Sequence, residues 1–161
     1  MLTATIEAVK AYFDATEKLR EEYQGAKERH LMKQSRLTAA RTSQLDGLPH
    51  SGGQYDGIQR LLESVEEAGS KADRLLKLLK ARQVEVEELA VKLERCGERG
   101  CEEMAELLRL RYIRGLSATA AIMRMYGVEP GQREWSKYHR RFYRRQERAF
   151  ELLAILAAKY F

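Results

Sequence analysis

The sequence predicts an all-α protein: a long antiparallel, coiled-coil-like helical hairpin, followed by a helix-turn-helix whose last helix is extended and basic. Three observations predict this fold class. Only two prolines occur among 161 residues, and helix-forming residue types are abundant. Apolar residues recur every three or four positions over long stretches, as in helices that pack along a seam. Glycines divide the C-terminal third into shorter helical segments.

The first helix of the predicted hairpin covers residues 3–40. Its inward positions alternate in steps of four and three, which defines a heptad seam, although threonine and histidine weaken it. These positions are Thr5, Val9, Tyr12, Thr16, Leu19, Tyr23, Ala26 and His30.

A turn-rich linker, residues 41–56, separates this helix from a second one over residues 57–97. The linker contains Asp46-Gly47, Pro49 and Gly52-Gly53, all of which interrupt regular structure. The second helix has a stronger seam, in which Arg82 is the only charged residue. The seam consists of Ile58, Leu61, Val65, Ala68, Ala72, Leu75, Leu79, Arg82, Val86, Leu89, Leu93 and Cys96.

The pattern does not say whether this seam packs on the first helix, on a second subunit or on both. We expect residues 1–97 to form a hairpin that also serves as an oligomerisation arm, giving a homo-oligomer of two or more subunits.

Three further helices are predicted after the glycines at 97 and 100. The first covers residues 101–114 and ends at Gly115, which suits the position after a helix. Ser117 begins a short helix over residues 118–126, and the last helix covers residues 133–159. A short helix followed by a glycine turn and a basic helix is the order of a helix-turn-helix DNA reader. We therefore expect residues 101–161 to form a DNA-binding domain.

The last helix has two separate faces when its residues are placed at 100° intervals. One arc is apolar, the other is basic, and Arg145 lies at the margin of the apolar arc. The apolar arc contains Trp135, Tyr138, Phe142, Ala149, Leu152, Leu153 and Leu156. The basic arc contains Arg133, Lys137, Arg140, Arg141, Arg144 and Arg148. An apolar stripe that holds the helix would leave six cations facing outward together.

The charge distribution favours double-stranded DNA as the partner of this basic face. Residues 1–106 carry a net charge of −3, and residues 107–161 carry +8. Closely spaced phosphates are the natural ligand of such a surface, because binding releases their counterions. The alternative is a solvated helix face, but solvated faces usually mix both signs of charge.

The helix-turn-helix geometry assigns a role to each polar residue. Those near the start of the last helix lie nearest the base edges, and those further along hold backbone phosphates. The base-edge candidates are Gln132, Arg133, Ser136, Lys137 and Arg140. The phosphate candidates are Arg141, Arg144 and Arg148 on the last helix, and Ser117 and Thr119 at the start of the short helix. For Ser117, helix capping is the competing role.

The segment Leu107–Ser117 (LLRLRYIRGLS) resembles the "LxxRYIxGxS" opening of the sigma-70 region-4-like fold. That fold forms the C-terminal domain of the phage and prophage late-gene regulators of the RinA/ArpU type. These regulators also carry an N-terminal helical hairpin with a turn-rich segment similar to Leu48–Asp56. The resemblance implies control of late or packaging genes through DNA near a promoter, in the bacterial host cytoplasm. It also implies structural roles for Arg111, Tyr112, Ile113, Gly115 and Ser117, and DNA contacts around His139–Arg140.

Other classes of function find little support in the sequence. Zinc needs four ligands, but Cys96 and Cys101 are the only cysteines, and the three histidines are scattered. The basic half lacks clustered carboxylates for Mg²⁺, and no glycine-rich phosphate loop occurs. No apolar run is long enough to span a membrane. We therefore expect no enzymatic activity, no metal or other cofactor and no membrane contact.

Two alternative functions remain open. Small terminase subunits also combine a helix-turn-helix with helical oligomerisation, and they recognise a packaging site. A coiled-coil interaction protein acting on host RNA polymerase without reading DNA would use the hairpin instead. The operator sequence, the sign of regulation and the subunit count are left open by the sequence.

Overall fold

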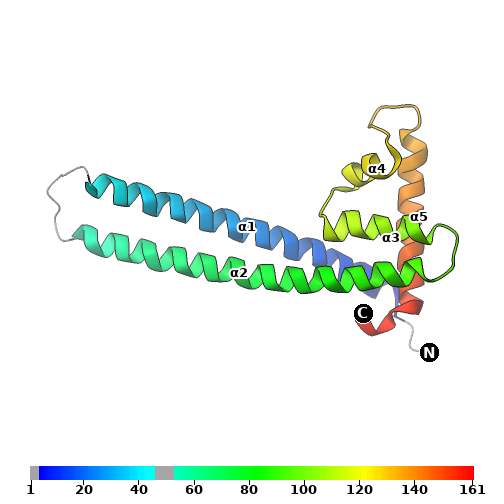
Figure 1. Ribbon diagram of the computed structural model, residues 1–161, viewed down its shortest axis with the longest axis horizontal. Coiled ribbons are helices and arrows are strands. Elements are labelled where there is room, and N and C mark those ends of the chain that lie inside the picture. The colour runs from blue at the N-terminus through cyan, green and yellow to red at the C-terminus, as the bar shows by residue number, and fades with distance from the viewer. Residues whose placement is uncertain (1–3, 46–52) are drawn as a thin grey trace. The chain divides into compact units, whose positions relative to one another are not determined.

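The computed structural model describes residues 4–45 and 53–161, and side chains over 4–42 and 57–161. The chain is all-α, as predicted, and its long N-terminal helices α1 and α2 pack together (Figure 1). The helices in chain order are α1 (Ile6–Leu45), α2 (Gly53–Glu94), α3 (Cys101–Leu108), the π-helix η1 (Arg109–Ile113), α4 (Ala118–Tyr126), α5 (Trp135–Leu156) and the short 3₁₀ helix η2 (Ala158–Tyr160). Within the described residues, no helix is both long and apolar enough to cross a bilayer.

Two compact units divide the chain. Unit 1 contains the start of α1 up to Lys18 and the chain from Lys80 to Phe161, whereas unit 2 is Leu19–Leu79. The expected boundary between residues 97 and 101 therefore falls inside unit 1. The physical reason is that the first turns of α1 and the last turns of α2 share one hydrophobic core with α3, α4 and α5.

Phe13 of α1 is at the centre of the core of unit 1. Its ring contacts Tyr112 of η1 at a centroid distance of 4.4 Å and stacks on Phe150 of α5 at 5.0 Å. The predicted seam of α1 omitted Phe13 and included Thr5, which is exposed. A heptad seam describes contact with one partner helix, but this part of α1 packs against several elements.

The seam of α2 is confirmed, because none of its predicted residues is exposed. In unit 1 its charged member, Arg82, lies over the ring of Tyr12 at 4.2 Å and pairs with Glu85 at 3.4 Å. In unit 2, Nδ1 of His30 lies 3.1 Å from the carbonyl oxygen of Val65. Arg82 in the seam of α2 and His30 in the seam of α1 therefore each have a partner that compensates for a polar side chain between the helices.

Both hairpin helices extend into the residues expected to form the linker 41–56. The helix α1 continues to Leu45 and α2 begins at Gly53, and the centre of that segment lies outside the described residues. The predicted helix over residues 101–114 changes its winding at Arg109, where the π-helix begins.

Two local features end η1 and begin α4. The chain leaves η1 at Gly115, whose φ of 72° suits glycine. The Ser117 hydroxyl oxygen then accepts a hydrogen bond from the Ala120 amide at 3.2 Å, so the predicted cap is confirmed. The last helix is shorter than the predicted 133–159, since α5 is Trp135–Leu156.

Candidate nucleic-acid interface

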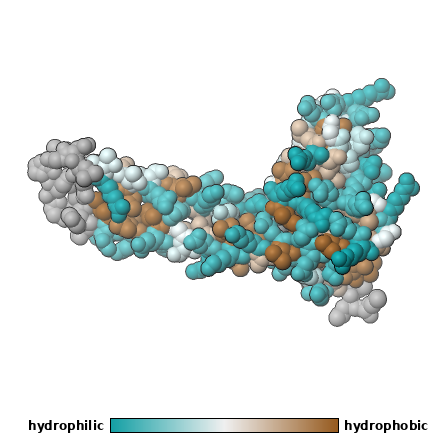
Figure 2. All heavy atoms as spheres, in the orientation of Figure 1, coloured by the Kyte–Doolittle hydropathy of each residue, from teal (hydrophilic) through white to brown (hydrophobic). Residues whose placement is uncertain are grey.

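The helix α5 is held by one face and exposes the other. Its buried residues include three members of the predicted apolar arc and two residues that the arc omitted, Phe150 and Ala154. They are Phe142, Ala149, Phe150, Leu153 and Ala154. Leu156, predicted to face inward, is exposed, because α5 ends there. Around α5 the surface in Figure 2 is largely hydrophilic.

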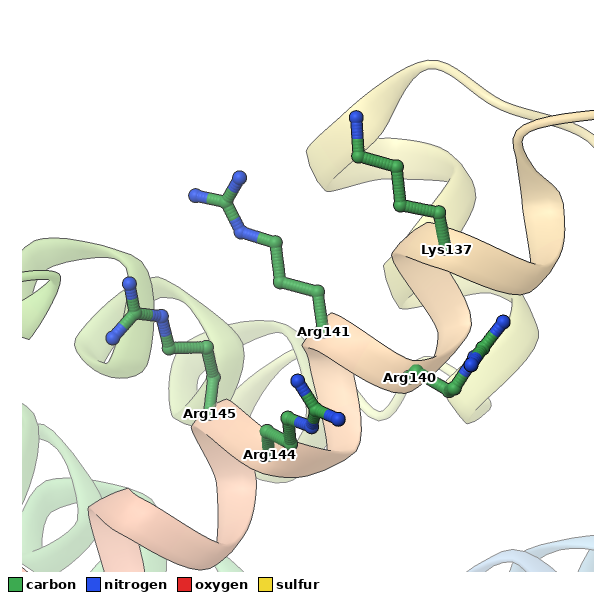
Figure 3. Close-up of a pocket in the computed structure, with 5 residues that line it drawn as sticks. All are labelled: Lys137, Arg140, Arg141, Arg144 and Arg145. Atoms are coloured by element: carbon green, nitrogen blue, oxygen red, sulfur yellow. The ribbon is translucent and has the colours of Figure 1, made fainter.

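Five cations of α5 line a shallow, open hollow of about 570 Å³ (Figure 3). They are Lys137, Arg140, Arg141, Arg144 and Arg145. Figure 3 shows Lys137, Arg141 and Arg145 extending to one side of the helix, while Arg140 and Arg144 leave it in other directions. With Arg148, these positions follow one another at helical spacing, so they form a continuous basic stripe.

Glu103 of α3 holds two arginines of this stripe. Its carboxylate accepts two hydrogen bonds from Arg141, at 2.8 and 2.9 Å, and one from Arg145 at 3.1 Å. The hydroxyl of Tyr126, at the end of α4, donates to the same carboxylate. Arg145 also donates to the carbonyl of Arg99 at 3.0 Å. A single acidic side chain therefore joins α3, α4 and α5.

Arg148 is held in a similar way by the loop before α3. Its Nε and Nη2 donate to Glu98 at 2.6 and 2.9 Å, and its Nη1 donates to Glu151 at 2.7 Å. Paired, parallel N–H···O bonds of this kind fix the guanidinium plane as well as its position. The sequence pattern placed Arg141 and Arg148 correctly on the exposed side but contained no signal for these partners.

The ion pairs also shift the acidity of the two glutamates. Partial burial raises the pKa of Glu103, but the bonds from Arg141 and Tyr126 outweigh this effect, so its pKa lies below the ordinary value. The bond from Arg148 lowers the pKa of Glu98. Both carboxylates are therefore charged at neutral pH, and both compete with any anion for the same arginines.

Four predicted cations have no such partner. Within the described part of the chain, no carboxylate lies within ion-pair distance of Arg133, Lys137, Arg140 or Arg144. The Arg140 Nε donates to the carbonyl of Ser136, at 3.3 Å, and the Lys137 Nζ lies 5.4 Å from the ring centre of Tyr138. No carboxylate of the described residues therefore competes with a ligand for these four cations.

The remaining predicted residues fall outside the stripe. Ser117 uses its hydroxyl oxygen as a cap acceptor, and Thr119, two residues further on, is exposed. Gln132 and Arg133 precede α5 instead of beginning it. Gln132 accepts a hydrogen bond from the Glu129 amide at 3.1 Å, so it stabilises the connection between α4 and α5. Ser136 is exposed in the first turn of α5.

The motif residues before α4 anchor this region to α1. Arg111 pairs with Glu17 at 2.5 Å and donates to the carbonyl of Leu116 at 3.1 Å. Tyr112 is buried, and its hydroxyl accepts a hydrogen bond from Gln146 of α5 at 3.2 Å. These contacts hold Arg111 and Tyr112 within the fold of unit 1.

Sequence reasoning did not identify four contributors to the site: Arg145, Glu98, Glu103 and Tyr126. The acidic partners lie 38 to 50 residues away from the arginines that they bind, so no local periodicity connects them. Over the residues that the structure describes, no group of three or more His, Cys, Asp or Glu side chains is placed to hold a metal ion.

No family model, curated protein or solved structure matches the chain.

Proposed function

We propose that this protein binds double-stranded DNA in a sequence-specific manner through the exposed face of α5. In this proposal it is a phage- or prophage-encoded transcriptional regulator that acts on late or packaging genes in the bacterial cytoplasm. The observation that carries the proposal is the basic stripe from Lys137 to Arg148. It spans about 16 Å of a helix whose opposite face is fixed in a hydrophobic core.

The contacts of the stripe support two kinds of binding residue. Arg141 and Arg148 are oriented by carboxylates and have fixed guanidinium planes, which suits contacts with phosphates at defined positions. Arg140 has no acidic partner among the described residues and projects from the helix, which suits it to reach a base edge, and Arg144, which also lacks an acidic partner there, is left for a phosphate. An arginine can bridge O6 and N7 of guanine.

The hairpin supports the proposed homo-oligomer. In unit 2, Leu31 and Met32 of α1 are 51% and 58% exposed. In the proposal, these two side chains contact a second subunit. Two subunits would present two copies of α5 to successive turns of DNA, as dimeric helix-turn-helix proteins do.

The test is fluorescence anisotropy of the full chain with duplexes tiled across the DNA that flanks its gene, over a series of salt concentrations. We expect one tile to be preferred by about 10³-fold or more. About six phosphate contacts should give a slope near −5 for log affinity against log salt concentration.

The other results would contradict the proposal in different ways. Equal, weak binding to all duplexes would mean that α5 binds nucleic acid without sequence specificity. Absence of binding at low salt would exclude DNA as the partner and favour a protein partner, such as RNA polymerase, for the hairpin. A preferred tile at a packaging site, bound by a ring-shaped oligomer, would favour a small terminase subunit.

A further inference from the structure

A row of aromatic side chains lies beside the basic stripe on α5 and has no role in the contacts described above. Trp135, His139 and Tyr143 follow one another at intervals of four residues. Their ring centres are 6.1 Å apart for the first pair and 4.9 Å apart for the second. The row spans about 12 Å along the helix.

The outer part of this row is open to solvent. Tyr143 is 43% exposed, and His139 is exposed as well. Within the described residues, the Tyr143 hydroxyl forms no hydrogen bond. Another aromatic residue of α5 behaves differently, because Tyr138 stacks on Tyr126 of α4 at 4.8 Å. Packing against α4 accounts for the position of Tyr138. It does not account for His139 and Tyr143, whose rings are exposed to solvent one turn apart.

The neighbours of the row indicate the chemistry of its ligand. Arg140 follows His139 and Arg144 follows Tyr143, and both arginines lack a carboxylate partner in the described part of the chain. Exposed aromatic faces next to unpaired cations form the arrangement that binds unpaired nucleotides: the bases stack on the rings, and the cations hold the backbone. In an intact duplex the base faces are covered by neighbouring bases, so phosphate contacts alone would leave these rings unused.

We propose that His139 and Tyr143 form a stacking site for unpaired bases, so that the protein prefers DNA containing a short open segment. The inference rests on the proposed binding of DNA by α5, and it adds a preference for melted DNA to that function. Arg144, the neighbour of Tyr143, supplies the adjacent backbone contact, and Arg140 keeps its proposed role at a base edge. Trp135 is half-buried and supports His139 from the preceding turn.

The experiment compares three probes of one sequence: a duplex, the same duplex with a central mismatched bubble, and the single strand. The full-length protein is titrated into each probe, and anisotropy gives the affinity. In the bubble probe, a fluorescent adenine analogue in the open segment reports stacking directly, because its emission falls when an aromatic ring covers it. We expect the bubble to bind about 5- to 150-fold more tightly than the duplex, as one stacked base would contribute.

Three variants locate the effect. Tyr143→Leu keeps an apolar side chain at an exposed position but removes the stacking face, so it should abolish the preference for the bubble and leave binding to the duplex unchanged. Tyr143→Phe keeps the ring and should keep the preference. His139→Gln should reduce the emission change in the bubble probe.

The outcomes separate this inference from the function on which it rests. Equal affinity of the unmodified protein for duplex and bubble would overturn the stacking site while leaving duplex recognition intact. An equal loss on both probes in Tyr143→Leu would also overturn it, since the residue would then act through the fold. Failure to bind any of the three probes would overturn both proposals.

Discussion

Replacing Glu103 with glutamine tests the ion pairs by which this carboxylate holds Arg141 and Arg145 of the basic stripe. The amide has nearly the same shape as the carboxylate but no charge, and one of its two oxygens becomes a donor. That NH₂ group would face the guanidinium of Arg141 or Arg145, whose N–H groups are also donors. The substitution therefore removes two ion pairs and at least one hydrogen bond without leaving a cavity.

The magnitude follows from how exposed the three side chains are. Glu103 is 15% exposed, Arg145 26% and Arg141 49%. Fully exposed pairs contribute about 0–1 kcal/mol, and removing one partner of a buried pair costs about 3–5 kcal/mol. This site lies between these limits and is screened on the Arg141 side. We therefore expect the free energy of unfolding to fall by about 2 kcal/mol, which lowers Tm by about 4–8 °C in a chain of this size.

Thermal and urea unfolding followed by circular dichroism measure this loss. Glu102→Gln is the matched control, because Glu102 also lies in the first turn of α3 but is exposed. It should change stability by no more than about 0.5 kcal/mol. An equal loss in both variants would refute the reasoning, since the effect would then come from the charge at the start of the helix and not from the arginine contacts.

The pH dependence gives a second check on the same residue. Because the pKa of Glu103 is lower in the folded protein than its ordinary value of 4.5, its contribution is fully present above that value and disappears as the pH falls through the folded pKa. The stability difference between the unmodified protein and Glu103→Gln should therefore be constant near neutral pH and shrink below about pH 4.5. A difference that persists unchanged at low pH would contradict the assignment.

Three further predictions concern the stripe and the core. In anisotropy, Arg140→Ala should reduce the preference for one duplex over the others, whereas Arg148→Ala should weaken binding to all duplexes alike. The reverse pattern would mean that Arg148 reads base edges and Arg140 contacts phosphates. Phe13→Ala should lower the free energy of unfolding by about 3–5 kcal/mol in urea titration, and a loss below about 1 kcal/mol would show that its contacts with Tyr112 and Phe150 do not stabilise unit 1. Gly100→Ala should cost about 1–3 kcal/mol, because φ at this position is 88° and a Cβ atom would lie 2.5 Å from Cζ of Arg145; unchanged thermal unfolding would mean that the loop shifts without cost.

The fold was predictable where one periodicity governs a long segment. The seam of α2 follows from the spacing of its apolar residues, and the amphipathic division of α5 follows from the same rule. The prediction failed at Phe13, because this residue packs on several elements that sequence spacing alone does not bring together. The change from α-helix to π-helix at Arg109 could not be predicted either, because the residue types of η1 are as typical of an α-helix as those of α3.

The candidate site was predictable only in part, for a similar reason. The basic face of α5 is a local pattern and can be read from a helical projection. The acids that orient it come from α3 and the loop before it, at sequence separations that no local pattern spans. Arg145 illustrates the limit: its position at the margin of the apolar arc gives no indication that Glu103 and the carbonyl of Arg99 hold it.

The most direct test of the central claim, that α5 is the DNA-binding surface, compares two double variants of equal charge change. Arg140→Gln combined with Arg144→Gln alters the exposed face of α5, and Lys71→Gln combined with Arg74→Gln alters two exposed cations of α2 in unit 2. Anisotropy with the preferred duplex should show that the first variant loses affinity by about tenfold or more. Its salt dependence should also become less steep by about 1, because Arg144 is its phosphate contact, whereas the second variant should behave like the unmodified protein. Equal losses in both variants would mean that DNA responds only to total charge, and the account of α5 as the binding surface would be wrong.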